Sequence, residues 1–254
     1  MGKISYRWLA IILLFIAVVM LVILKNTDFE EYIKYVGIAI SINLISSVII
    51  IYLIDFKRED DMNQELENKR KIIYGQLIQP LRNFDDLILN MYKSCVSFQE
   101  MEELEYNIDN VDKILEKIKL LDTSKEGYMR KMDFKTIPLW KETIALNFSN
   151  LLKDIDKFYA DNAYYLSLGL TEDINQILKI KSNKMILNLM LNPIISMEMG
   201  SIIDVFDFKQ LLFSSFNIKE EISKYYSEEQ FKINKEKFLR EDISPGFGSG
   251  IKKS

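Results

Sequence analysis

Two long uncharged apolar runs near the N-terminus constrain this chain more than any other feature. The first covers residues 8–24 and the second covers residues 36–54, and neither contains a charged residue or a proline. At about 1.5 Å per residue, helices of these lengths reach roughly 26 and 29 Å, which is close to the hydrocarbon thickness of a bilayer. The sequence therefore predicts a transmembrane two-helix hairpin within residues 1–56.

The charges that flank the two runs predict the orientation of this hairpin. Lys3 and Arg7 precede the first run and five basic residues follow the second within residues 57–71, whereas the connecting segment 25–35 carries two lysines and three acids. Because basic residues collect on the cytoplasmic side of membrane helices, we expect both termini in the cytoplasm. The chain is thus predicted to be integral to the plasma (inner) membrane, with the lipid bilayer as its first partner.

The second apolar run also contains small and polar residues that predict helix–helix packing. One group falls within about 100° of a single helix face, and a second pair of small residues falls on another side. The two groups are Ala39, Asn43, Ser46 and Ser47, and Gly37 with Ser41. The first group has two interpretations: it joins the two helices of one hairpin, or it joins hairpins of neighbouring subunits or lines a narrow polar path.

Residues 57–254 form the predicted cytoplasmic part, and the composition of the chain favours helices there. The chain has nine Gly and four Pro among 254 residues, about half the usual share of roughly 12%. With so few turn formers, we expect an all-α fold rather than a many-stranded sandwich or barrel. We predict a coiled-coil-like helical stalk over residues 57–79, a helical bundle over residues 80–243 and a flexible tail over residues 244–254.

Two seams of apolar residues recur at spacings of three and four, along residues 74–98 and, in a shifted register, along residues 101–118. Pro80 predicts a kink or restart of the first helix, and the shift of register predicts a break near Ser97 or a stammer. The predicted seam residues are Leu77, Leu81, Phe84, Ile88, Met91, Leu104, Ile108, Val111, Leu115 and Ile118. Such seams occur inside antiparallel bundles and in parallel coiled coils that would make a homo-oligomer, and both interpretations stay open.

Further helices are predicted from capping residues in the second half of the chain. Thr136 is expected to cap a helix that runs to about residue 160, and Thr171 is expected to cap the next helix, which Pro193 ends. A final pair of helices is expected over residues 204–226 and 228–240.

The residue types that are missing exclude several classes of function. The chain has no His and a single cysteine, Cys95, which excludes Ser-His-Asp and Cys-His nucleophile pairs, His-ligated metal sites, thiolate zinc clusters and disulfides within the chain. The net charge of −4 argues against nucleic acid as the main partner. No glycine-rich phosphate loop, GxSxG elbow or kinase signature occurs, so we expect no cofactor and no catalytic residue.

A run of carboxylates beside the second seam is the one pattern that points to catalysis. Its members are Glu102, Glu105, Asp109, Asp112 and Glu116. The pattern is similar in part to the paired Glu-x-x-Glu and Glu-x-x-Asp elements of helical nucleotide pyrophosphatases, which implies a magnesium-dependent hydrolase as a third functional class. All five residues are expected on one short helix with no second acidic helix facing them, so a solvated charged face is the favoured interpretation.

Together these features favour a non-catalytic, membrane-anchored protein whose cytoplasmic domain recruits an unidentified protein or ligand and which self-associates. The alternative is a membrane-perturbing effector that is triggered through the cytoplasmic domain and oligomerises through Asn43. The architecture resembles small prokaryotic proteins that join a two-span hairpin to a cytosolic helical domain, some of which are membrane-disrupting defence effectors. That resemblance implies the effector role as the alternative function.

Overall fold

The chain is all-helical in the part that the structure, a computed structural model, describes. The described residues are 6–27, 30–127, 137–180, 184–192, 197–231, 239 and 246–251. Within them there is no strand, and the extended pairings are two isolated β-bridges, between Leu121 and Ile251 and between Glu126 and Leu139. The expected all-α class is therefore confirmed.

The chain divides into two compact units, Met1–Asn68 and Lys69–Ser254, which we call unit 1 and unit 2. Unit 1 contains α1 (Tyr6–Asn26) and most of α2 (Glu31–Tyr74), and the boundary between the units falls inside α2. The stalk predicted over residues 57–79 is consequently shared between the two units.

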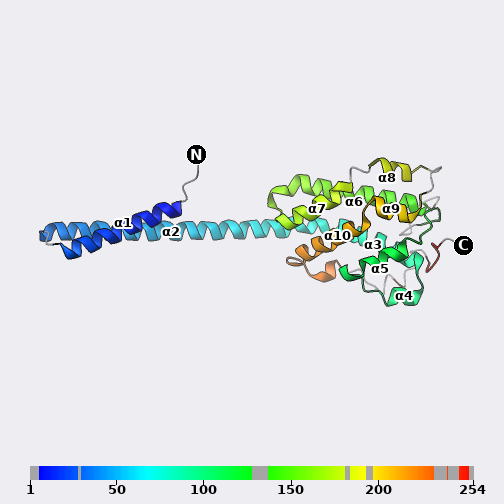
Figure 1. Cartoon of the computed structure of the whole chain (residues 1–254), viewed down its shortest axis with the longest axis horizontal. Coiled ribbons are helices and arrows are strands. Elements are labelled where there is room, and N and C mark those ends of the chain that lie inside the picture. Colours follow the sequence, from blue (N-terminus) through cyan, green and yellow to red (C-terminus); the bar gives the residue numbers. More distant parts are fainter. Residues whose placement is uncertain are drawn as a thin grey trace. The chain divides into compact units, whose positions relative to one another are not determined.

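The N-terminal part of the chain contains a helical run that is long and apolar enough to cross a membrane. This run extends from Glu31 to Cys95, and among the described residues no other run meets that criterion. The apolar stretch of α1, Ile11–Asn26, is shorter. In unit 1, α1 lies beside the first part of α2 (Figure 1). These features indicate a membrane association near the N-terminus.

Unit 2 packs short helices around one hydrophobic core (Figure 1). Its elements after α2 are η1 (Gly75–Leu77), α3 (Ile78–Cys95), α4 (Phe98–Glu102), η2 (Ile108–Asn110), α5 (Val111–Ile118), α6 (Trp140–Asn162), η3 (Ala163–Tyr165), α7 (Leu168–Lys179), α8 (Lys184–Met190), α9 (Met199–Val205), α10 (Phe208–Ser223) and η5 (Glu228–Gln230). Helices α3 and α6 pack against each other, and α10 packs against α3, α5 and α7.

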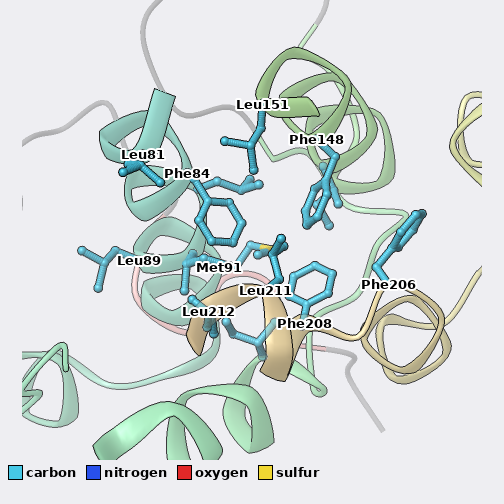
Figure 2. Close-up of a cluster of buried hydrophobic side chains, with 14 of the residues drawn as sticks. Leu81, Phe84, Leu89, Met91, Phe148, Leu151, Phe206, Phe208, Leu211 and Leu212 are labelled. Atoms are coloured by element: carbon cyan, nitrogen blue, oxygen red, sulfur yellow. The ribbon is translucent and has the colours of Figure 1, made fainter. Parts of the chain in front are cut away.

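Phe148 of α6 lies among several aromatic rings of this core (Figure 2). The centroid of its ring lies 5.9 Å from that of Phe84, 5.5 Å from that of Phe206 and 5.0 Å from that of Phe208. The rings come from α3, α6, α10 and the residue that follows α9. Aromatic rings at these separations attract each other beyond the area they bury, so this cluster ties four segments together.

The junction between α2 and α3 lies close to the predicted interruption. Helix α2 ends at Tyr74, the 3₁₀ turn η1 follows, and α3 begins at Ile78. Pro80 lies in the first turn of α3. Backbone N–H groups in the first turn of a helix have no intrahelical acceptor, so the N–H that proline lacks costs no hydrogen bond there. The predicted restart of the helix is therefore present, a few residues before the proline.

The prediction of a single helix over residues 101–118 is wrong, because α4, η2 and α5 divide this stretch. The predicted break at Ser97 is confirmed, because the Ser97 side chain accepts from the Glu100 N–H and the Glu100 carboxylate accepts from the Ser97 N–H. However, α4 ends at Glu102, and the next turn begins where the Asn107 side chain accepts from the backbone N–H of Asn110. Asparagine side chains that bond the local backbone compete with a continuous helix, and here they divide it.

Two predicted caps also differ from the structure. Thr136 and Pro193 lie outside the described residues. Helix α6 begins after Leu139, and the Leu139 N–H donates to the Glu142 carboxylate at 2.9 Å. Helix α7 is capped by Ser167, not by Thr171, which lies in the first turn and donates to the Ser167 carbonyl. A residue one turn earlier had the same capping chemistry, and the spacing of the apolar residues does not choose between them.

Helix α10 corresponds to the first helix predicted near the end of the chain, over residues 204–226, and it ends at Ser223, before the predicted division at Ser227. Helix α9 ends at Val205, and α10 starts after Asp207, which adopts a left-handed conformation with φ of 44°. The Asp207 side chain accepts from the Gln210 N–H and so caps α10. Most of the second predicted helix, over residues 228–240, lies outside the described residues.

The C-terminal segment 246–251 packs against unit 2, so the predicted flexible tail is wrong for these residues. The Gly250 N–H donates to the Ser94 carbonyl at 2.9 Å, and the Gly250 carbonyl accepts from the Asp122 N–H at 2.8 Å. A Cβ at Gly250 would lie 2.7 Å from Leu121 Cδ1 and 2.9 Å from Ser94 Cβ. The segment thus satisfies a carbonyl at the C-terminus of α3, in a gap that only glycine fits.

Candidate functional site

The face of α2 that meets α1 is built around Gly37. A Cβ at this position would lie 2.5 Å from Leu24 Cδ1, so the missing side chain lets the two helices approach closely. One turn further along, Ser41 is fully buried, and its hydroxyl donates to the Gly37 carbonyl at 2.9 Å. Val48, two turns beyond Ser41, is buried as well. The predicted pair of small residues, Gly37 and Ser41, therefore lies where α1 and α2 pack.

The larger predicted group lies on the other side of α2. Ala39, Asn43, Ser46 and Ser47 are all exposed. At about 100° per residue, the centre of this group is roughly opposite the positions that contact α1. The structure does not place these four side chains between α1 and α2, which leaves contacts with neighbouring subunits, or a polar path, as their remaining interpretation. We refer to the four residues as the outer polar face.

Apart from this group, the surface of α1 from Ile11 and of α2 over residues 36–54 is strongly apolar. Phe15 of α1 is 69% exposed, and Leu53 and Ile54 of α2 are 59% and 60% exposed. Apolar patches of this extent are rare on proteins that face water, and they mark surfaces that meet a membrane or another protein. The outer polar face is thus a polar stripe within an apolar surface.

In unit 2, a buried ion pair joins α3 to α10. Lys219 Nζ lies 2.8 Å from Asp85 Oδ1, and the Tyr106 hydroxyl donates to the same oxygen at 2.8 Å. The ammonium of Lys219 also lies 4.2 Å from the centroid of the Phe216 ring. The Lys219 and Asp85 side chains are 12% and 4% exposed. The pair thus links α3 to α10, and neither charge is buried without a counter-ion.

The environment of this ion pair shifts the titration of its members. Burial raises the pKa of the Asp85 carboxyl, and the Lys219 ammonium opposes that rise. Burial, together with the neighbouring Asp85 carboxylate, raises the pKa of the Tyr106 hydroxyl well above its usual value. The tyrosine therefore stays neutral and acts as a hydrogen-bond donor to the carboxylate.

The five carboxylates predicted as one stripe do not share a helix. Glu102 ends α4, Glu105 lies in the loop that follows, Asp109 lies in η2, and Asp112 and Glu116 lie on α5. Asp112 accepts from Lys209 of α10 at 2.8 Å. In the part of the chain that the structure describes, no three His, Cys, Asp or Glu side chains come together as metal ligands could. The prediction that the five carboxylates form one stripe on a single helix is therefore wrong.

The predicted seam residues pack within unit 2. Those that lie in its hydrophobic core are Leu77, Leu81, Phe84, Ile88, Met91, Leu104, Val111, Leu115 and Ile118. The tenth residue, Ile108, is 39% exposed at the start of η2. Cys95 at the end of α3 is buried too, and burial raises the pKa of its thiol to about 12, which makes it a poor nucleophile.

Sequence reasoning did not find the Asp85–Lys219 pair. The two residues are 134 positions apart, and neither belongs to a motif, so no local pattern connects them. The only available signal was Asp85 itself, a charged residue next to the buried stripe of α3.

No family model, no curated protein and no solved structure matches this chain.

Proposed function

We propose that this chain is a non-catalytic, membrane-anchored interaction protein that self-associates, with two transmembrane helices and both termini in the cytoplasm. One observation carries the proposal. Large apolar side chains lie on the surface of unit 1 along α1 and the first part of α2, whereas unit 2 buries most of its own in one core. A bilayer would cover the first set, and water would solvate the surface of the second unit.

The lengths of the two N-terminal helices support two spans. Helix α1 has 21 residues, which corresponds to roughly 32 Å and is enough to cross the hydrocarbon core. Helix α2 begins at Glu31 and includes the whole uncharged run 36–54. The close approach of Leu24 to Gly37 pairs the end of α1 with the start of α2, as a two-span hairpin requires.

Unit 2 is proposed as the part that binds a cytoplasmic protein or ligand. Tyr164 in η3 and Leu168 at the start of α7 are 89% and 77% exposed, which offers apolar contact area near one end of α7. The carboxylates that could have formed a metal site are distributed over separate elements, and Asp85 is buried against Lys219. These placements favour recognition over catalysis.

Membrane fractionation and cysteine labelling test the anchor and its orientation. The full chain should remain in the membrane pellet after alkaline carbonate extraction, and its release into the supernatant would overturn the proposal. In a Cys95→Ser background, an impermeant maleimide added to intact cells should label Asn26→Cys at the C-terminal end of α1. The matched exposed position Ser227→Cys in unit 2 should react only after the cells are opened. Labelling of Ser227→Cys in intact cells would show the reverse orientation.

The outer polar face favours a second candidate function, a membrane-perturbing effector. Because Asn43 and the two serines point away from α1, helices from several chains could enclose a polar path. Membrane potential and growth, measured in bacteria that express the full chain or a fragment starting at Lys57, separate the two functions. An effector should depolarise cells only as the full chain, and Asn43→Leu should abolish the effect. Unchanged potential with both the full chain and the fragment favours the interaction protein.

A further inference from the structure

We infer that a second copy of this chain packs on the outer polar face of α2 in the membrane, with Asn43 at the centre of the contact. This inference rests on the proposed membrane insertion and names the surface through which the protein self-associates. It follows from where α1 lies, from the hydrogen-bonding chemistry of Asn43 and from the size of its neighbours.

Asn43 is the residue whose environment requires a partner. It lies near the middle of the uncharged run 36–54, and no hydrogen bond involves its side-chain amide in the part of the chain that the structure describes. An amide offers two donors and an acceptor, and lipid tails satisfy none of them. Helix α1 cannot supply the partner, because it packs on the side of α2 that carries Gly37 and Ser41.

The neighbouring serines can satisfy their hydroxyls within the helix, whereas Asn43 can satisfy only part of its amide there. A helical asparagine can donate one N–H to the carbonyl one turn earlier, as Asn90 does to Asp86 at 2.7 Å, but the second N–H and the oxygen are left without a partner. A serine hydroxyl in a helix can donate to the carbonyl one turn earlier, as Ser41 does to Gly37 at 2.9 Å. Ser46 and Ser47 can use the same bond, one turn beyond Asn43. They therefore contribute small side chains to the outer polar face, while Asn43 contributes the unsatisfied polar group.

These properties identify the partner as the same helix from a second copy. Around a two-fold axis, the amide of one Asn43 meets the identical amide at the same depth, and each donates to the other's oxygen. Ala39, Ser46 and Ser47 lie one turn before and after it, so the two backbones can approach closely. An unrelated apolar span would offer neither an acceptor at that depth nor the matching small residues.

Disulfide crosslinking in membranes maps the predicted contact. In the full chain with Cys95→Ser, oxidation should crosslink Ser46→Cys into a dimer. The matched position Ile49→Cys, which is 51% exposed but lies about 100° around the helix from the outer polar face, should crosslink weakly. Ser41→Cys, buried against α1, should not crosslink between chains. Equal crosslinking of Ser46→Cys and Ile49→Cys would overturn the inference.

Energy transfer between labelled full-length chains in lipid vesicles measures the contribution of Asn43. Asn43→Leu should weaken association about five- to tenfold, and Asn43→Gln, which keeps the amide, should retain most of it. Ile42→Leu is the matched control, because Ile42 is exposed next to Asn43 and off the outer polar face. If Asn43→Leu associates as tightly as the parent chain, the inference is wrong.

Carbonate extraction of every variant separates this inference from the proposal on which it depends. Variants that stay in the membrane pellet but show no preference for the outer polar face would refute the dimer contact and leave the anchor standing. A parent chain that carbonate extracts would refute the membrane anchor itself, and the dimer contact with it.

Discussion

The two units of this chain place the same kinds of side chain in opposite ways. Phe15 in α1 is 69% exposed, whereas Phe148 in α6 is fully buried among other aromatic rings. In unit 1 a small residue, Ser41, is buried, while many isoleucines and leucines are exposed on the surface. In unit 2 nearly all of the predicted seam residues lie in the hydrophobic core. The difference shows that unit 2 hides its apolar surface by folding, while unit 1 leaves that task to its surroundings.

Replacing one phenylalanine in each unit tests this comparison with the largest expected effect. Phe148→Ala should lower the free energy of unfolding of unit 2 by about 4 kcal/mol, because it removes contacts with three other rings and leaves a cavity. Phe15→Ala should change it by less than about 0.5 kcal/mol. Denaturant unfolding of the full chain in mild detergent, followed by tryptophan fluorescence, measures both. Similar losses from the two changes would contradict the comparison.

The charged pairs of unit 2 sharpen the comparison between buried and exposed positions. Asp85→Ala should destabilise unit 2 by about 3 kcal/mol, since it leaves the Lys219 ammonium buried without its counter-ion. Asp112→Ala removes the partner of Lys209 at an exposed pair and should cost less than about 1 kcal/mol. The double change Asp85→Leu with Lys219→Met should recover much of the first loss in the same unfolding assay. A double variant as unstable as Asp85→Ala would contradict this account.

Two glycines near the C-terminus test whether the last described segment belongs to unit 2. Gly250→Ala should lower the stability of unit 2 by about 2 kcal/mol, because its Cβ would overlap Leu121 and Ser94. Gly246→Ala is the matched control, because a Cβ there meets nothing within 4 Å. Both are measured by thermal unfolding. If the two variants behave alike, the segment does not pack as described.

The pH dependence of unit 2 is the smallest expected effect. Hydrogen bonds from Lys117 and Ser97 lower the pKa of the Glu100 carboxyl from 4.5 to about 2. Because the pKa is lower in the folded chain, the stabilisation is present above pH 4.5 and is lost as the pH falls towards 2. Glu100→Gln should therefore flatten stability in that pH window, whereas Glu116→Gln, at an exposed position on α5, should leave its shape unchanged. If the stability of Glu100→Gln fell between pH 4.5 and 2 as it does in the parent chain, the hydrogen bonds of Glu100 to Ser97 and Lys117 would not contribute as described.

Some elements could be predicted because their signals are local. The helix that ends near residue 160 and the break near Ser97 were predicted from patterns within a few residues, and both are present. The helix over residues 101–118 was predicted from spacing alone, and it failed because asparagines at 107 and 110 bond the backbone between its halves. A regular apolar spacing is compatible with a helix. Whether asparagine side chains bond the backbone and interrupt that helix depends on how the surrounding residues pack.

The sequence by itself determined the all-helical class and the apolar N-terminus, because turn-former content and the length of an uncharged run are properties of the chain alone. Only the tertiary structure decided which face of α2 meets α1. Both faces carry small residues at helical spacing, and the choice depends on how closely Leu24 can approach Gly37. Tertiary structure also paired Asp85 with Lys219 and placed Gly250 against Ser94, because residues so distant in sequence meet only when the helices have packed.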